Sequence, residues 1–519
     1  MMAFKILALL PLILGQCFAA NILAVLFFPG VSHFQMFKPV LKELARRGHS
    51  VDVYSSFPSD EKIKGYTDIV LESSAPKLTN NVTFQYLKNL QGTMSIINLS
   101  TTFGAKACDA VFKSTQMQYL KNSTKNYDLV ITQLFSTECL LGWGWHFGAP
   151  NVVMTSSVNL PWSAYMFGNP DNPSYIPTYL AKSGVVMNLY ERIVNTWDLV
   201  MSKLIYWWYS SLPSNQVAKE FFGQDMPDLD ILARNISLQL INTHFSILGA
   251  IPLVPNIVEV AGLHIQQPKP VDKYFDGVLT TDKKGIIYFN TGTLIKSETF
   301  PIQTTQAIFD AFAQLPYKVI WKATKENFPN GLSFPENIHF EKWLPQQNIL
   351  CDPRVKLFVS HGGMFGTQET VYCGVPILGI PYFADQFLNI NQAEAAGFAK
   401  MLDFDNISKE TVLEAAKELL DNPKYLQKSK EISHQFKDRP SSAMDTAIYW
   451  IEYVIRHKGA PQLQSPAKNL TWYQYYLLDV FIVAVGIPSI LISLFVKLIS
   501  KIVGSNGSRR HRNKKVKTK

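Results

Sequence analysis

The stretch from Glu341 to Gln386 constrains this chain more than any other part of the sequence. Within it, Val355–Ser360 is a short apolar run rich in valine and phenylalanine, which predicts a buried parallel strand. The run stops at His361-Gly362-Gly363. Glycines at a turn from strand to helix let backbone N–H groups approach an anion, and the start of the helix adds a partial positive charge. The turn is therefore a candidate phosphate site.

A second strand with polar side chains after it extends this site. Residues 375–380 predict the next strand, and Asp385 and Gln386 lie in the loop that follows it. Glu369 falls in the first turns of the helix after the His-Gly-Gly turn. Because ligands of open α/β sheets bind at the carboxyl ends of the strands, we expect His361, Glu369, Asp385 and Gln386 to share one cleft.

The segment resembles the nucleotide-sugar signature of the UDP-glycosyltransferase family. A glycine pair or a tryptophan alone would be weak evidence, but here the elements occur together and in order. The resemblance implies a donor site in which Trp343 stacks on uracil, Gln346 lies at the base or ribose, His361, Gly362 and Gly363 bind the pyrophosphate, Glu369 accepts hydrogen bonds from the ribose, and Asp385 and Gln386 bind the sugar hydroxyls. Upstream, Gly292-Thr293 follows a predicted strand and matches a turn that helps to hold the diphosphate.

The chain departs from the family pattern at one donor position. Many members have asparagine four residues after the histidine of the signature, where this chain has Phe365. Any polar contact that the asparagine side chain makes is therefore absent here or is made by another group.

The rest of the chain predicts two α/β domains. Residues 22–28, 36–47 and 51–55 read as strand, amphipathic helix and strand, and this unit resembles the first βαβ unit of the family. We expect an N-terminal acceptor-binding domain over 21–262 and a C-terminal UDP-sugar-binding domain over 284–455, joined by a linker rich in proline and charge. The fold class that the resemblance implies is α/β of the GT-B type, in which two doubly wound, Rossmann-like domains face a cleft.

Catalysis is expected to involve a histidine in the first domain. A histidine near neutral pKa suits removal of a proton from an acceptor hydroxyl, and His33 follows the first strand, where the resemblance puts the general base of the family. Such a base needs an acidic partner, but a plain alignment puts Gln133 at the usual aspartate. We therefore expect Glu138, one helical turn further on, to be the partner of His33. No metal and no cofactor is expected, with the UDP-sugar as co-substrate.

Both ends of the chain carry targeting signals. Residues 1–20 have a lysine, an apolar core and small residues near the end, which is typical of a secretory signal peptide. A second apolar run over 477–496 is long enough to span a bilayer as a transmembrane helix. Nine bases and no acid follow it in 497–519, which predicts a basic cytosolic tail and a type I single-pass protein. Without those nine, the remaining bases equal the 40 acids, so the charge does not indicate nucleic-acid binding.

The tail and the sequons indicate a compartment. Lys517 and Lys515, third and fifth from the end of the sequence, resemble a dilysine retrieval signal of the endoplasmic reticulum, with a generic basic stop-transfer tail as the alternative. Sequons lie on the predicted luminal side at Asn81, Asn98, Asn122, Asn235, Asn406 and Asn469, which predicts a glycoprotein. Four cysteines remain after the signal peptide, and their spacing matches no metal motif.

We therefore expect inverting transfer of a hexose from a UDP-sugar to a hydroxyl of a small lipophilic acceptor at the luminal face of the endoplasmic reticulum. Glucose is favoured as the sugar, with UDP-glucuronate as the alternative donor. A second alternative is a catalytically silent protein that binds UDP-sugars or lipophiles. Membrane lipid is an expected partner, and the sequence does not decide whether the chain forms a homo-oligomer. Residues 185–209 are aromatic and apolar, and either a lid over the acceptor or a contact with the membrane would explain them.

Overall fold

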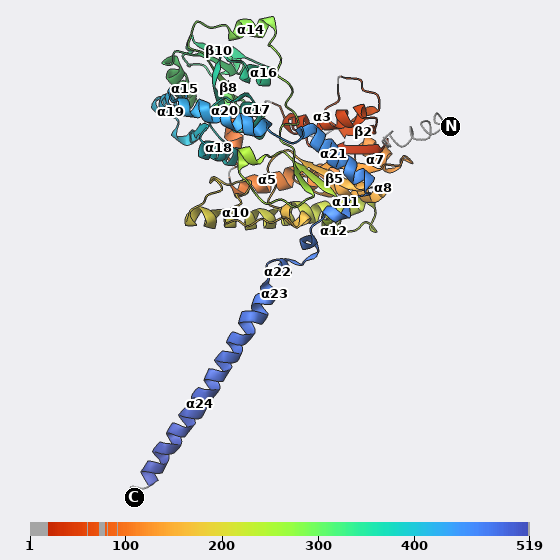
Figure 1. Ribbon diagram of the computed structural model, residues 1–519, viewed down its shortest axis with the longest axis vertical. Helices are drawn as coiled ribbons and strands as arrows, with labels where there is room; N and C mark the ends of the chain where they lie inside the picture. Colours follow the sequence, from red (N-terminus) through yellow and green to blue (C-terminus); the bar gives the residue numbers. More distant parts are fainter. Residues whose placement is uncertain (1–18, 60, 72–77, 80, 91, 517–519) are drawn as a thin grey trace, which may run out of the picture. The chain divides into compact units, whose positions relative to one another are not determined.

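Two parallel sheets organise the chain as far as Gln464 (Figure 1). The computed structural model describes residues 19–516, except 60, 72–77, 80 and 91. Residues up to Gln464 form one unit, which we call the globular unit, and residues from Ser465 onward form a second. The predicted signal peptide falls almost wholly outside the described residues.

The first sheet has seven strands in the order β3-β2-β1-β4-β5-β6-β7, and every pairing in it is parallel. The order reverses direction beside β1, so the loops after β1 and β4 open at the same edge, where a ligand of such a sheet binds. Its strands are β1 Asn21–Leu26, β2 Ser50–Ser55, β3 Tyr66–Val70, β4 Leu129–Gln133, β5 Asn151–Thr155, β6 Leu238–Ile241 and β7 Ile257–Glu259.

The second sheet has six parallel strands in the order β10-β9-β8-β11-β12-β13. The strand predicted over Val355–Ser360 is confirmed with those bounds, and the one predicted over 375–380 is shorter. Its strands are β8 Ile286–Asn290, β9 Lys318–Lys322, β10 Ile338–Glu341, β11 Val355–Ser360, β12 Ile377–Gly379 and β13 Ala399–Met401.

Helices connect the strands and cover both sheets. With the first sheet come α3 Val31–Arg46, α4 Phe84–Lys88, α5 Thr93–Phe103, α6 Ala105–Phe112, α7 Thr115–Lys121, α8 Gly142–Phe147, α9 Ala164–Phe167, α10 Leu189–Tyr206, α11 Leu212–Phe222, α12 Leu229–Arg234 and α13 Phe245–Leu248. With the second come α14 Lys273–Leu279, α15 Ile302–Ala313, α16 Gln346–Leu350, α17 Met364–Cys373, α18 Gln386–Ala395, α19 Lys409–Asp421 and α20 Pro423–Lys437. The next helix, α21 Ala443–Arg456, returns to pack on α3 and β6 of the first sheet.

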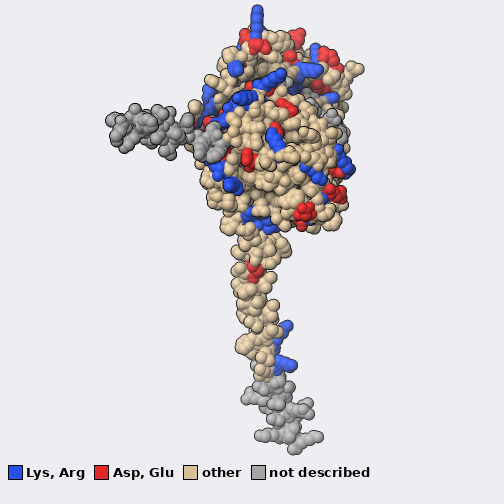
Figure 2. Space-filling model, turned by 90° about the vertical axis from the view of Figure 1, so that its right-hand side faces the viewer, with Lys and Arg blue, Asp and Glu red and all other residues tan. Residues whose placement is uncertain are grey.

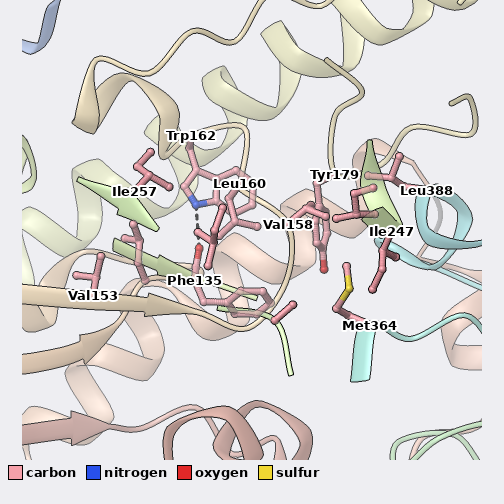
Figure 3. Packing of buried hydrophobic residues seen from close by; sticks show 14 of the residues in the cluster. Phe135, Val153, Val158, Leu160, Trp162, Tyr179, Ile247, Ile257, Met364 and Leu388 are labelled. Carbon is pink, nitrogen blue, oxygen red and sulfur yellow. Dashed lines mark hydrogen bonds between the residues drawn. The ribbon is translucent and has the colours of Figure 1, made fainter. Parts of the chain in front are cut away.

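The two halves of the globular unit share a buried apolar cluster (Figure 3). Trp162 and Phe135 come from the first half, and the Trp162 indole donates a hydrogen bond to the Phe135 carbonyl at 2.8 Å. Tyr179 and Ile247 lie beside Met364 of α17 and Leu388 of α18. Apolar burial of this kind is the main favourable term in folding, so the cluster fixes one half against the other.

Two disulfides add covalent links within the globular unit. Cys108 of α6 pairs with Cys139 in the turn after β4, and Cys351 after α16 pairs with Cys373 at the end of α17. All four cysteines beyond the predicted signal peptide are therefore paired.

The second unit is mainly one long helix. Residues Leu478–Ile502 are long and apolar enough to cross a membrane, and none of the window is buried in the protein. The helix has one acid near its start, Asp479, and lysines near its end, Lys497 and Lys501 (Figure 2). The predicted span over 477–496 is thus confirmed as a candidate membrane helix, which runs several residues further than the sequence indicated.

Candidate functional site

The His-Gly-Gly turn after β11 holds the His361 ring between two glycines. A Cβ atom at Gly292 would lie 2.7 Å from the ring, and one at Gly363 would lie 2.4 Å from its Nε2 atom. Real Cβ atoms do not approach other atoms so closely, so any side chain at either position would displace the imidazole. The glycines predicted at the diphosphate therefore give His361 its place, and Thr293 follows Gly292 in the loop after β8.

This turn has the properties of an anion site. Gly363 precedes α17 and supplies no side chain to cap it, so backbone N–H groups of the first turn are available to a ligand. Burial lowers the pKa of His361 to about 4, so the ring is neutral at physiological pH. The Lys322 Nζ atom donates to the Gly292 carbonyl at 2.6 Å and brings an amine to the same turn.

A chain of polar contacts leads from β8 to the predicted ribose-binding acid. The Gln346 amide donates to Glu369 Oε2 at 2.5 Å, while its oxygen accepts from Asn290 at 2.5 Å and from the Tyr288 hydroxyl at 3.2 Å. Burial raises the pKa of Glu369 to about 7. Gln346 therefore orients Glu369, a role that adds to the base or ribose contact predicted for it.

Trp343 lies in the loop after β10 and is 63% exposed. Among the described residues, the aromatic ring that neighbours it is that of Phe275, with the ring centroids 6.1 Å apart. A large, exposed aromatic face is suitable for stacking on a planar base. The position of Trp343 is thus compatible with the role predicted for it.

Asp385 and Gln386 begin α18 and face different surroundings. The Asn389 amide joins Asp385 to the His-Gly-Gly turn, since it donates to Asp385 Oδ2 at 3.2 Å and to the Gly362 carbonyl at 2.9 Å. Burial raises the pKa of Asp385 to about 6. The Gln386 oxygen, by contrast, accepts from the backbone N–H groups of Tyr382 and Phe383, so only its amide NH2 is left for a sugar.

His33 lies in the first turn of α3, at the carboxyl edge of the first sheet. Phe28 and Phe135 enclose its ring, with centroids 4.4 and 4.7 Å away. Its Nδ1 atom is 2.7 Å from the Gln133 amide and 2.8 Å from the Ser156 hydroxyl, and among the described residues Nε2 has no hydrogen bond. Burial lowers the pKa of His33 to about 3, so the ring is neutral and can accept a proton.

The predicted partnership of Glu138 with His33 is wrong. Glu138 lies beside Tyr206 and Ser211, and burial raises its pKa to about 7. It immediately precedes the short helix Cys139–Leu141, whose first residue is joined to α6 by a disulfide. The residue that ends β4 is Gln133, and it reaches His33.

Sequence reasoning missed four residues that complete these sites: Ser156, His264, Lys322 and Asn389. Ser156 directly follows β5, so a polar residue after a predicted strand was the available signal. His264 lies in the linker, with Nε2 3.9 Å from Glu369 Oε1, and nothing in the local sequence indicates it. Phe365 packs against His264 at 4.8 Å between ring centroids, so an apolar contact occupies the position where many members of the family have asparagine.

Comparison with known proteins finds relatives that match over most of the chain. Residues 24–509 match the family described as UDP-glucoronosyl and UDP-glucosyl transferase. The chain is 36% identical over 481 residues to UDP-glucosyltransferase 2 of Dactylopius coccus, which covers 92% of each chain. It is 38% identical over 518 residues to UDP-glycosyltransferase UGT5 of the same organism, covering 97% of each. It is 30% identical over 509 residues to human UDP-glucuronosyltransferase 2B15, covering 93% of this chain and 94% of the relative.

Solved structures support the fold. The glycosyltransferase of kitacinnamycin aligns with a TM-score of 0.58 at 14% identity, covering 84% of this chain and 98% of that one. The calicheamicin glycosyltransferase CalG4 aligns with a TM-score of 0.53 at 16% identity, covering 86% and 100%. The predicted GT-B architecture is therefore confirmed.

Proposed function

The chain belongs to the family of UDP-glucuronosyl and UDP-glucosyl transferases, and from this premise we propose that it moves glucose from UDP-glucose to a hydroxyl of a small lipophilic acceptor, with inversion at the anomeric carbon. As a member it is an enzyme that transfers a sugar from a UDP-sugar to an acceptor. The identity of the sugar, the class of acceptor and the roles of individual residues are the proposed parts.

His33 carries the proposal as the general base. In the tautomer that can act as a base, Nδ1 carries the ring proton and donates it to the Ser156 hydroxyl oxygen 2.8 Å away, so Nε2 is left without a proton and can accept one from an acceptor hydroxyl. When the hydroxyl oxygen attacks the anomeric carbon, its proton passes to Nε2. Phe28 and Phe135 around the ring favour an apolar acceptor over a strongly hydrated one.

The leaving UDP takes the electron pair of the bond to the sugar, so negative charge grows on the diphosphate. The open N–H groups at the start of α17, the His361 ring and the Lys322 amine are the groups proposed to stabilise it. Trp343 would hold the base, Glu369 the ribose, and Asp385 with Gln386 the sugar hydroxyls.

Glucose is favoured because UDP-glucosyltransferase 2 of Dactylopius coccus is more similar to this chain than the human glucuronosyltransferase is. The test is a donor panel with one promiscuous phenol. UDP-glucose and UDP-glucuronate would be compared by kcat/KM for UDP release, with the product identified by mass. A higher kcat/KM for UDP-glucuronate would overturn the choice of sugar.

The proposed location is the endoplasmic-reticulum membrane, with the globular unit in the lumen and the basic end in the cytosol. The apolar helix Leu478–Ile502 and the basic residues after it support this orientation. In intact microsomes, protease added outside should remove a tag placed after the last residue and leave the globular unit whole. Protection of the tag would overturn the orientation.

A further inference from the structure

Helix α10 and its continuation into α11 turn apolar side chains towards the solvent. About half of the exposed large hydrophobic side chains in the globular unit lie between residues 186 and 212. They recur every three or four residues, so they form one stripe along the helix. The stripe consists of Val186, Leu189, Tyr190, Ile193, Val194, Trp197, Val200, Leu204, Trp207, Trp208, Tyr209 and Leu212. We call it the α10 stripe.

The opposite face of α10 is already packed against the globular unit, through the apolar residues Leu199, Ile205 and Tyr206 and through buried polar residues. Asn195 is 1% exposed and contacts three backbone groups, donating to the carbonyls of Pro173 and Ile176 and accepting from the Thr178 N–H. Ser210 and Ser214 are also fully buried, with hydrogen bonds to the loop after β4. The helix is therefore anchored on its inner face, and its outward face, where a surface helix normally carries polar side chains, is an apolar surface that would be costly in water.

Charged groups do not interrupt the stripe. The acids and bases within residues 186–212 are Glu191, Arg192, Asp198 and Lys203, and none of them is fully exposed. Lys203 pairs with Asp171, and Arg192 donates to the Met187 carbonyl. The outward face of the helix is thus aliphatic and aromatic, with tryptophan and tyrosine along its length, a composition typical of the membrane interface.

We propose that the α10 stripe docks on the surface of a lipid bilayer, with its aromatic side chains in the headgroup region. The candidate membrane helix of the same chain would hold the globular unit close to that surface. The globular unit ends at Gln464 and the candidate membrane helix begins at Leu478, so the connection spans at most about 50 Å when fully extended. A globular unit tethered this closely meets the bilayer at a high effective concentration.

The end of the globular unit is also connected to the helices that follow α10 along the chain. The Gln464 amide donates to the Ile236 carbonyl just beyond α12, and Asn215 of α11 contacts both Asp228 and Leu229 at the start of α12. Helix α11 is the continuation of α10, which runs along an outer edge of the globular unit (Figure 1). The connection to the candidate membrane helix therefore starts beside α12, which contacts α11, the continuation of the helix that carries the stripe.

The test uses the full chain in phosphatidylcholine nanodiscs. Because all four cysteines beyond the predicted signal peptide are paired, one added cysteine can carry an environment-sensitive fluorophore. Leu204→Cys puts the label in the stripe, and Tyr119→Cys puts it at an exposed hydrophobic position on α7. Lipids with a quencher near the headgroup should quench the label at 204 at least severalfold more than the label at 119. Both labelled proteins should bind UDP like the unmodified chain, which shows that the fold is kept.

Equal quenching at the two positions would overturn the proposal. So would protection of the label at 204 without lipid quenching, together with cross-linking between copies through that cysteine, because the stripe would then be an interface between two chains. A second variant combines Ile193→Ser, Trp197→Ser and Leu204→Ser, with Tyr119→Ser, Ile302→Ser and Leu426→Ser as the matched control set. Only the first set should increase the hydrogen exchange of α10 in nanodiscs. No change, or the same change in both sets, would refute docking.

Discussion

The proposed donor and acceptor halves of the site, called the donor half and the acceptor half below, differ in how far along the chain their contacts reach. In the donor half, Gln346 contacts Glu369 across 23 positions, and Asn389 contacts Asp385 across four. In the acceptor half, His33 contacts Gln133 across 100 positions and Ser156 across 123. The donor half is therefore built from consecutive strand-loop-helix units, whereas the acceptor half depends on how separate strands of one sheet are ordered.

The halves also differ in charge. Two buried carboxyls in the donor half, Glu369 and Asp385, have pKa values raised by burial to about 7 and about 6. In the acceptor half, the proposed base His33 has neutral partners at Nδ1 among the described residues, and burial lowers its pKa to about 3. A neutral partner orients the imidazole but cannot stabilise its protonated form as a carboxylate does.

The largest effect is expected from His33→Ala. General-base catalysis contributes about 10²- to 10⁴-fold to a rate, so kcat should fall by a factor in that range. Affinity for UDP, measured by calorimetry, should stay the same because His33 belongs to the acceptor half. His146→Ala is the matched control, since among the described residues that ring contacts the Lys121 carbonyl and aromatic neighbours and lies in α8, outside both halves. Retained turnover in His33→Ala would end the separation of the two halves.

Gly363→Ala should damage the donor half through geometry alone. The backbone of Gly363 has φ −63°, which any residue adopts, so only the new methyl group against His361 acts. We expect UDP affinity to fall at least about tenfold, equivalent to about 1.4 kcal/mol. Gly277→Ala is the control, because nothing lies within 4 Å of a Cβ atom there. Unchanged UDP affinity in Gly363→Ala would mean that the turn does not hold the diphosphate.

The contrast explains what the sequence could predict. Most of the donor half lies in one segment. The sequence therefore predicted the strand Val355–Ser360, its glycine turn and the acid eight residues after His361 together. The partner of His33 was not predicted, because it depends on β4 lying beside β1 and on β5 lying beside β4. The expectation of an acidic partner for His33 favoured Glu138, although Gln133 is the residue that ends β4. His264 could not be predicted for the same reason, because it lies in the linker and only the folded chain brings it to Glu369.

Asp385→Asn should distinguish binding of the sugar from binding of the nucleotide within the donor half. Loss of one charged hydrogen-bond acceptor for the sugar corresponds to about 1.5–3 kcal/mol, so kcat/KM for the UDP-sugar should fall about ten- to a hundredfold. Free UDP should bind as before, because the carboxyl is proposed to contact the sugar alone. The matched variant is Glu369→Gln, which should weaken free UDP as well. If both variants weaken UDP equally, the division along the ligand is incorrect.

Gln133→Glu would give the acceptor half the charge that it lacks, at the same side-chain length. A carboxylate at Nδ1 stabilises the protonated imidazole, so the pKa of His33 should rise from about 3 towards the ordinary value of 6.5. Only the neutral ring accepts a proton, so the acid side of the kcat–pH profile should move to higher pH. Ser156→Ala, which adds no charge, should leave that limb in place. An unmoved limb in Gln133→Glu would show that the two residues do not form a pair in turnover.

The smallest effect on turnover is expected from Glu138→Gln, because Glu138 lies beside Tyr206 and Ser211 and makes no contact with His33 among the described residues. Its effect should appear in stability instead. Burial raises the pKa of Glu138 from 4.5 to about 7, so between these values the folded chain keeps a proton that the unfolded chain has lost. Stability of the unsubstituted protein therefore falls as pH rises through that window. The amide variant lacks this loss, and its melting temperature relative to the unsubstituted protein should rise between about pH 5 and about pH 8, by an amount equivalent to at most about 3 kcal/mol. A fall in kcat as large as that of His33→Ala would instead return Glu138 to the acceptor half.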